Sequence, residues 1–215
     1  MKTTSKTDVF DSHVAEYEAW YEKHPEVYAS ELKAIRAHFN RMPEELHGIE
    51  VGLGTGRFAA PLGIKEGVEP SLPMAEKARM RGIEVMEALA ESLPYADLQF
   101  DFVLYVTLCH LEDPTHAFRE AFRVLKPGGA LIAAFLPEDR LVAREYLARR
   151  PWTTFYKHAR FYPVTGVASM LEACGFRKLE FNQTLFGELD SIQEVQMPEA
   201  GSDRGSFVVV SALKP

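Results

Sequence analysis

A turn of alternating glycines constrains this chain more than any other segment. Gly52, Gly54 and Gly56 closely follow Glu50, at the point where a short apolar run ends and a helix can begin. Because glycine has no β-carbon, three glycines spaced by two let the backbone turn sharply and approach a ligand closely. The pattern predicts an α/β fold that binds a ligand where its first strand ends.

A second carboxylate stands at the end of the next apolar run. Glu69 lies 19 residues after Glu50 and closes the segment Gly67-Val68-Glu69. Nucleotide-binding α/β folds place at about this spacing the acid that holds a ribose, and an ionised carboxylate offers two oxygens to its hydroxyls. The glycine turn and this acid together predict an adenosine-type cofactor.

The position of the third glycine distinguishes between cofactors. A dinucleotide fingerprint needs glycine or alanine at position 57, where the helix packs closely on the strand, and this chain has Arg57 there. The third glycine is instead Gly56, and the resulting G-x-G-x-G loop after an acid resembles motif I of the class I methyltransferases that use S-adenosylmethionine. An NAD-dependent oxidoreductase becomes a less favoured alternative.

Later segments continue this resemblance in order and at the expected spacing. The closest similarity is to the small-molecule methyltransferases grouped with ubiquinone and menaquinone biosynthesis, and it covers about residues 50–135 closely and the flanks loosely. The matching segments are the second-strand acid with its helix at 68–79, A-E-x-L-P-F at 90–95, F-D-x-V at 100–104, H-L-x-D-P at 110–114 and R-x-L-K-P-G-G at 123–129.

The resemblance implies transfer of a methyl group from S-adenosylmethionine to a small-molecule acceptor by in-line displacement. It leaves open whether the nucleophile is N, O, S or C. It assigns Gly52, Gly54 and Gly56 to the methionine part of the cofactor, Glu50 to organising that loop or the amino group, and Glu69 to both ribose hydroxyls. The further cofactor-binding residues that we predict are Pro70, Met74, Ala90, Glu91, Thr107, Tyr17 and Tyr28. Many relatives carry an Asp before the Ala-Glu pair, where this chain has Leu89.

Two residues are candidates for the catalytic end of the site. His110 follows the fourth predicted strand, and an imidazole there can act as a base or position the acceptor, or else pack against the loop before Pro114. Tyr156 belongs to the aromatic segment 152–162, which roofs the acceptor pocket in the family that the chain resembles. Its aromatic, weakly basic character favours a small aromatic or amine acceptor.

The pattern of elements predicts a single domain with a Rossmann-like, doubly wound sheet of seven mostly parallel strands and helices on both faces. Residues 1–45 are predicted to form a helical lid, 46–136 the cofactor-binding core, 137–175 the helices over the substrate, and 176–215 an antiparallel edge hairpin. Phe10, Val14, Tyr17 and Tyr21 recur at helical spacing before Pro25. Residues 187–205 are predicted to be a polar loop.

Charge and composition restrict the partners. A net charge of -7 without a Lys/Arg cluster argues against nucleic acid, and the two cysteines lack metal-ligand spacing, so no metal is expected. The absence of a run of about 20 apolar residues argues against a membrane span, and we expect a cytoplasmic monomer or homodimer. A non-catalytic protein that binds S-adenosylmethionine or acts as a scaffold is the main alternative.

Overall fold

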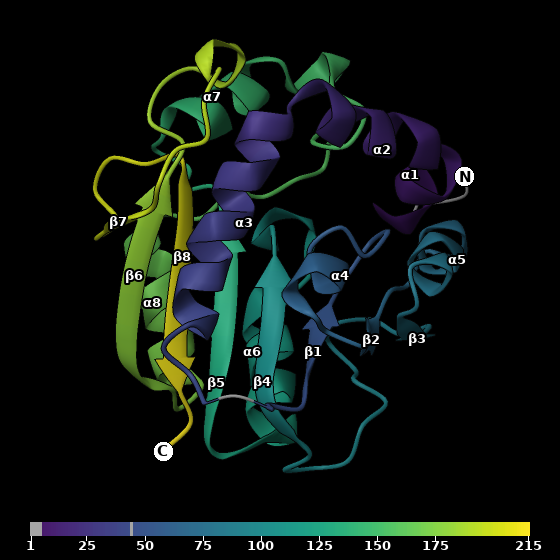
Figure 1. The fold of residues 1–215 in the computed structure, drawn as a ribbon, viewed down its shortest axis with the longest axis vertical. Helices are drawn as coiled ribbons and strands as arrows, with labels where there is room; N and C mark the ends of the chain where they lie inside the picture. The colour runs from purple at the N-terminus through teal and green to yellow at the C-terminus, as the bar shows by residue number, and fades with distance from the viewer. Residues whose placement is uncertain (1–5, 44) are drawn as a thin grey trace.

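One open sheet forms the centre of the structure, a computed structural model that describes residues 6–43 and 45–215 (Figure 1). Its strands are β1 Gly48–Val51, β2 Glu66–Val68, β3 Glu84–Met86, β4 Phe100–Val106, β5 Leu125–Phe135, β6 Arg177–Thr184, β7 Glu199–Ala200 and β8 Phe207–Leu213. They lie in the order β3-β2-β1-β4-β5-β8-β6-β7. The first five pair in parallel, whereas β8 is antiparallel to both of its neighbours and β7 is antiparallel to β6.

The predicted fold class is confirmed, with one more strand than the seven expected. The eighth strand, β7, pairs only Glu199 and Ala200 with β6. Two residues are too few to produce the alternation of apolar and polar side chains by which a strand is recognised in a sequence. The insertion of β8 between β5 and β6 makes the antiparallel edge that the C-terminal segment predicts.

The central strands are buried on both faces. In β5, Ile132 and Ala134 belong to one apolar core, and Leu131 and Ala133 belong to another core on the opposite side. Successive side chains of a strand point to opposite faces, so a continuous apolar run is what a sheet covered on both sides requires.

Helices cover the two faces. Their bounds are α1 Lys6–Ser12, α2 Val14–Lys23, α3 Pro25–Phe39, α4 Ala59–Leu62, α5 Leu72–Met80, α6 Pro114–Val124, α7 Leu141–Ala148 and α8 Val164–Ala173. α3 packs on β5, β6 and β8 in front of the sheet in Figure 1, while α6 and α8 pack behind it. α1 and α2 lie above the strand ends on the same side as α5, so the N-terminal helices lie over the edge where ligands bind in such sheets.

The N-terminal helical pattern forms two helices and not one. α1 ends at Ser12 and α2 begins at Val14, with His13 between them at φ -130 and ψ 31. Ser12 Oγ donates to the carbonyl of Asp8, and His13 Nδ1 lies 2.9 Å from the carbonyl of Val9. These side chains use carbonyls that a continuous helix would need, which explains the break. Residues 1–5 and 44 of the predicted lid lie outside the described residues.

The segment 187–205, predicted to be a polar loop, is anchored to the body of the protein. It contains a single 3₁₀ turn, Leu189–Ser191, and the short β7. Ile192 is buried, and the backbone N–H of Gln196 donates to Ser30 Oγ of α3 at 2.8 Å. The loop therefore packs along α3, next to the cavity described below.

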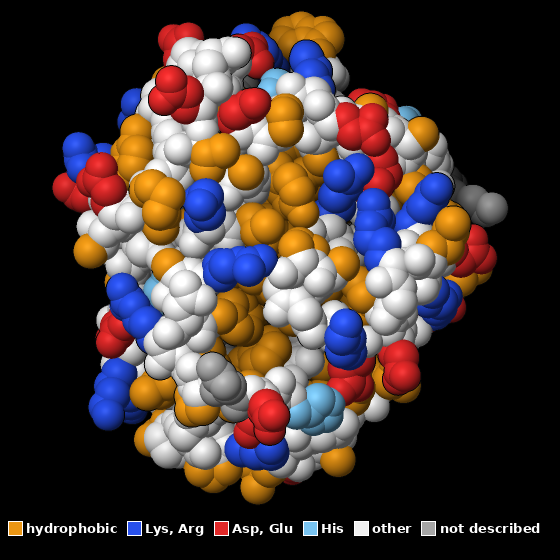
Figure 2. Space-filling view, in the orientation of Figure 1, with side chains coloured by type: hydrophobic (Ala, Val, Ile, Leu, Met, Phe, Trp, Pro, Cys, Tyr) orange, Lys and Arg blue, Asp and Glu red, His pale blue; other side chains and the backbone are white. Residues whose placement is uncertain are grey.

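The face that carries α3 presents charges of both signs. Figure 2 shows Lys, Arg, Asp and Glu side chains interspersed there, with hydrophobic side chains exposed between them. No helix within residues 6–43 and 45–215 has both the length and the apolar composition needed to cross a bilayer.

Candidate active site

The glycine turn connects β1 to α4 and opens toward a cavity. Gly52, Gly54 and Gly56 all have positive φ, at 69°, 56° and 79°, a conformation that glycine adopts without strain. The N–H groups of Gly52 and Leu53 both donate to the carbonyl of Val68, at 2.9 and 3.1 Å, and these bonds fix the turn against β2. A β-carbon added at Gly52 would meet no described atom within 4 Å, so this side of the turn is free to receive a ligand.

Gly56 differs from the other two glycines in its surroundings. It does not line the cavity. A β-carbon at this position would lie 2.5 Å from Cδ1 of Ile83 and 3.3 Å from Cβ of Ala78, so glycine here lets the turn pack closely on α5 and the residues after it. This is the helix-packing role that a dinucleotide fingerprint gives to its third glycine, fulfilled here one position earlier.

Glu69 extends from the end of β2 with both carboxylate oxygens held. The backbone N–H of Gly54 donates to Oε2 at 2.8 Å, and that of Ser71 donates to Oε1 at 2.9 Å. Burial raises the pKa of this carboxyl to about 7, although the two N–H groups favour its ionised form. Each oxygen retains a lone pair that can accept a further hydrogen bond from a ligand.

Glu50 is a buried carboxylate with an unused acceptor. It is 1% exposed, it lines the cavity, and Oε2 has no hydrogen-bond partner among the described residues. Burial raises its pKa well above the usual range, and the charge of Glu69 raises it further, against a hydrogen bond from the backbone of Ala59. A cationic group of a ligand would both ionise Glu50 and satisfy its free oxygen.

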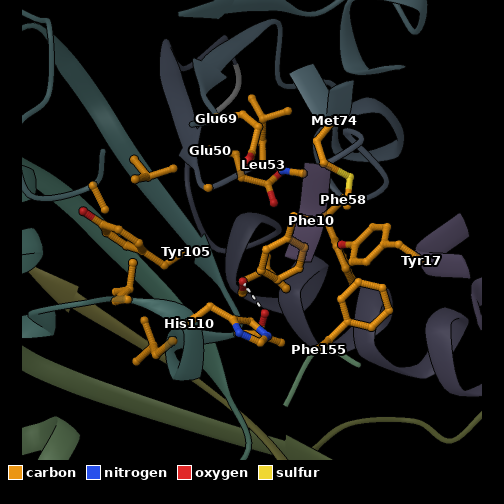
Figure 3. A pocket seen from close by; sticks show the side chains of 18 of the residues that line it. Phe10, Tyr17, Glu50, Leu53, Phe58, Glu69, Met74, Tyr105, His110 and Phe155 are labelled. Carbon is orange, nitrogen blue, oxygen red and sulfur yellow. Dashed lines mark hydrogen bonds between the residues drawn. The ribbon is translucent and has the colours of Figure 1, made fainter. Parts of the chain in front are cut away.

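A cavity of about 510 Å³ connects these carboxylates to the ends of the strands and to the N-terminal helices. Figure 3 shows Glu50 and Glu69 together at one side of it, with His110 opposite and Phe10, Tyr17 and Phe155 gathered beside them. Twelve of the fourteen predicted site residues line it: Tyr17, Glu50, Gly52, Gly54, Glu69, Pro70, Met74, Ala90, Glu91, Thr107, His110 and Tyr156. The other two, Gly56 and Tyr28, do not.

Tyr28 supports the turn from behind. Its hydroxyl donates to the backbone carbonyl of Arg57, and its ring packs edge-on against Phe58 at 5.4 Å. Tyr17 lies against the glycine turn, where the resemblance placed a residue that covers the cofactor. Its hydroxyl would be 3.2 Å from a β-carbon added at Gly54. The two tyrosines therefore differ in what they contact, although both lie on apolar faces of the N-terminal helices.

A half-buried ion-pair network joins α2 to the glycine turn. Glu18 of α2 accepts hydrogen bonds from Thr55 Oγ1, from Arg57 at 2.8 Å and from Arg81 at 2.6 Å. Burial opposes ionisation of Glu18, but the hydrogen bonds from Arg57, Thr55 and Arg81 prevail and lower its pKa to about 2. The helix that carries Tyr17 is thus held directly on the glycine turn.

The end of β4 places Thr107 and His110 at the cavity. Thr107 has φ 61°, an uncommon conformation for a β-branched residue, and its N–H donates to the carbonyl of Ala134 at 2.9 Å. The ring of His110 lies between two aromatic rings, with Phe10 edge-on at 5.1 Å and Tyr156 tilted at 5.5 Å. Burial raises the pKa of Tyr156 well above its usual range, so this phenol stays neutral and can donate a hydrogen bond.

Glu91 orders the neighbouring loop. Its Oε1 accepts the N–H groups of Glu112 and Asp113, both at 3.0 Å. Leu89 and Ala90 line the same part of the cavity, and Met74 is buried behind them in α5. An apolar wall next to Glu69 is suited to a flat base attached to a ribose.

Sequence reasoning missed Glu31, which also lines the cavity. It lies on the buried side of α3, between Val27 and the pair Ala34 and Ile35. An acid at the i+4 position of an apolar helix stripe is the signal that could have identified it.

Known proteins that resemble this chain include methyltransferases. Residues 49–133 match the methyltransferase domain family. One solved relative is an S-adenosylmethionine-dependent methyltransferase of Thermotoga maritima, described as a possible histamine N-methyltransferase. It is 40% identical to this chain, and its crystal structure superposes with a TM-score of 0.92. The similarity covers 98% of this chain and 100% of that one.

Two relatives in the curated proteins extend the comparison. An uncharacterised protein of Methanocaldococcus jannaschii is 38% identical over 96% of this chain and 99% of its own length. The ubiquinone/menaquinone biosynthesis C-methyltransferase of Pseudomonas putida is 32% identical over 58% of this chain and 46% of its own length. Because the Thermotoga similarity extends over both whole chains and not only the glycine turn, this chain belongs to the class I S-adenosylmethionine-dependent methyltransferases.

Proposed function

We propose that this enzyme transfers the methyl group of S-adenosylmethionine to a small-molecule acceptor held in the aromatic part of its cavity. The observation that carries the proposal is the continuity of that cavity, which is lined at one end by Glu50 and Glu69 and at the other by aromatic side chains of the N-terminal helices and by Phe155 and Tyr156. Its volume of about 510 Å³ is in the range of small-molecule sites.

The residues at the β1 and β2 ends fit the cofactor. Oε2 of Glu50 lacks a partner and suits the α-amino group, while Glu69 presents two oxygens that suit the ribose hydroxyls. Gly52 leaves space where a side chain would intrude on the methionine part. Met74, Ala90 and Pro70 line the neighbouring wall, where we place the adenine.

When bound, S-adenosylmethionine supplies an electrophilic methyl group, and the electron pair of the broken C–S bond stays on sulfur as the acceptor attacks. The protein has to align the acceptor and exclude water, and strong acid-base catalysis is not required. We assign His110 and Tyr156 to contact with the acceptor. The neutral phenol of Tyr156 is suited to donating a hydrogen bond, because its raised pKa makes it a poor base at neutral pH.

Methyl transfer can be tested directly. The purified protein is incubated with S-adenosylmethionine carrying an isotope-labelled methyl group and a panel of amines, phenols, thiols and carbon acids. The panel includes histamine, because the Thermotoga relative is described as a possible histamine N-methyltransferase. Mass spectrometry should detect a labelled product that disappears when S-adenosylhomocysteine is added in excess.

The main alternative, a protein that binds the cofactor without catalysis, makes a different prediction. S-adenosylhomocysteine would bind in calorimetry, yet no member of the panel would become labelled. Parallel titration with NADH tests the oxidoreductase alternative, for which NADH and not S-adenosylhomocysteine would bind.

A further inference from the structure

A buried carboxylate lies in the cavity at a position that the cofactor does not account for. Glu31 is 8% exposed and lines the cavity from α3, and no hydrogen bond or ion pair links its carboxylate to any residue within 6–43 or 45–215. A carboxyl group that has no protein partner and faces a confined cavity is suited to a ligand that pairs with it.

Aromatic rings from three parts of the chain line the same cavity as Glu31. The charge of Glu31 acts on Tyr21 of α2, on Tyr146 of α7 and on Tyr156 of the segment after it. Tyr146 and Tyr156 stack on each other with ring centroids 3.9 Å apart and an interplanar angle of 16°. The electron-rich faces of such rings attract cations, particularly where water is excluded.

Two tyrosines separate this acid from the cofactor carboxylates. The charges of Glu50 and Glu69 act on Tyr17, whereas that of Glu31 acts on Tyr21. The hydroxyls of Tyr17 and Tyr21 lie 2.9 Å apart, and both residues line the same cavity. Glu31 therefore belongs to the acceptor end of the cavity.

We propose that Glu31 binds the ammonium group of an amine acceptor, whose aromatic or aliphatic body lies against Tyr146 and Tyr156 and whose nucleophilic atom lies toward His110. This proposal rests on the proposed function, because it names the class of acceptor for that same site. The bound ammonium is the anchor and a different atom accepts the methyl group, since a protonated nitrogen has no lone pair for attack. Glu31 is thus a binding residue that determines specificity.

The ionisation of Glu31 gives the proposal a second readout. Burial raises the pKa of Glu31 to about 8, with no contribution from a described Lys, Arg or His. The titratable groups that face it are Tyr21, Tyr28, Tyr146 and Tyr156, whose pKa values burial raises, so they are neutral at pH 7. At pH 7 the free protein holds Glu31 protonated, and pairing with an ammonium releases that proton.

The experiment compares 2-phenylethylamine with 2-phenylethanol, which has the same ring and chain but no charge. Both are titrated by calorimetry into the protein saturated with S-adenosylhomocysteine, at pH 7 in two buffers of different ionisation enthalpy. We expect the amine to bind at least about tenfold more tightly than the alcohol, as a charge-assisted contact predicts. Amine binding should release about one proton per site.

Two variants identify the residue responsible. Glu31→Gln should weaken amine binding about tenfold and abolish proton release, with little change for the alcohol. Glu26→Gln removes a charge from the same helix outside the cavity and should change neither. Equal binding of amine and alcohol by the wild-type protein, or proton release that persists in Glu31→Gln, would overturn the proposal.

The same titrations keep the two proposals apart. If S-adenosylhomocysteine fails to bind, the proposed function is wrong. If it binds but the amine shows no preference, only the role of Glu31 is wrong. Should Glu31→Gln fail to fold, the amine-to-alcohol ratio and the proton release of the wild-type protein still decide the question.

Discussion

The two ends of the cavity are built in different ways. The cofactor end is formed by turns at the ends of β1 and β2, where backbone N–H groups hold Glu69 and positive-φ glycines shape the turn. The acceptor end is formed by side chains of α2, α3, α7 and the segment before α8, which come together only in the folded chain. The geometry of the first end depends on residues that are close together in the sequence, and that of the second depends on how the helices pack.

This difference predicts that the two ends of the cavity respond separately to substitution. Gly52, Gly54 and Glu69 depend on each other through the bonds of one turn, so a change in any of them disturbs cofactor binding. Tyr146, Tyr156 and Glu31 are carried by separate elements and can change one at a time. The predictions below test whether the two ends are in fact independent.

The largest effect is expected for Glu69→Ala. Loss of two charge-assisted hydrogen bonds to the ribose should weaken S-adenosylhomocysteine binding by about 3 kcal/mol, or roughly 100-fold. Binding of 2-phenylethylamine at the other end should change by less than about twofold if the sites are independent. Calorimetric titration of both ligands measures this, with Glu76→Ala on the exposed side of α5 as the control. A parallel loss of amine affinity would show that the ends are coupled.

Replacing Gly56 should lower the free energy of unfolding more than replacing Gly52 of the same turn. Gly56→Ala combines a strained positive φ with a contact 2.5 Å from Ile83, so the free energy of unfolding should fall by about 3 kcal/mol. Gly52→Ala has the same backbone strain but open space, and it should lose about 1 kcal/mol. Urea unfolding compares them. Equal losses would mean that Gly56 has no special packing role.

Cofactor affinity should rise with pH. Burial sets the pKa of Glu69 at about 7, and the ribose hydroxyls need its ionised form, so affinity should increase about tenfold between pH 6 and 8. Titration at several pH values measures the slope, which Glu69→Gln should flatten. A slope unchanged in that variant would assign it to another group.

The same carboxyl has the opposite effect on the ligand-free fold. Because the pKa of about 7 in the folded protein exceeds the ordinary value of 4.5 for a Glu carboxyl, the folded state binds the proton more tightly than the unfolded state. The stability that Glu69 contributes is therefore complete below pH 4.5 and declines as pH rises toward 7. Urea unfolding of the wild-type protein and of Glu69→Gln at pH 5 and pH 7 should show this difference.

The smallest effect is expected at the lid. Glu18→Gln leaves Arg81 without its charged partner and Arg57 with only the exposed Glu22, 3.8 Å away, and should weaken S-adenosylhomocysteine binding by about 1 kcal/mol, through looser packing of α2 on the turn. Glu22→Gln, whose side chain is 74% exposed, is the matched control and should have little effect. If the two variants behave alike, the Glu18 network does not hold the lid.

The sequence predicted the fold class, because the apolar runs and turns that define it are local in the chain. The mostly parallel sheet and its antiparallel C-terminal strands are confirmed, and Gly52 and Glu69 line one cavity. The break at His13 was not predicted, because it depends on side-chain bonds that the apolar spacing of the N-terminal segment does not reveal.

The surroundings of other site residues could not be predicted from the sequence, because they depend on contacts between segments far apart in the chain. Gly56 shares the positive φ of Gly52, and only the folded structure shows that a β-carbon there would lie 2.5 Å from Ile83, where Gly52 has open space. Tyr17 and Tyr28 lie on similar apolar faces, yet only Tyr17 lines the cavity. Glu31 is recognisable as an acid on an apolar helix face, but the tyrosines that line the same cavity come from α2, α7 and residue 156.

The most direct test of the central claim is transfer of an isotope-labelled methyl group from S-adenosylmethionine to the acceptor panel, followed by mass spectrometry. Our account predicts a labelled small-molecule product with the wild-type protein and a product reduced roughly 100-fold in Glu69→Ala at limiting cofactor. Tight binding of S-adenosylhomocysteine without labelling of any acceptor would contradict it, and would identify the protein as one that binds the cofactor without using it.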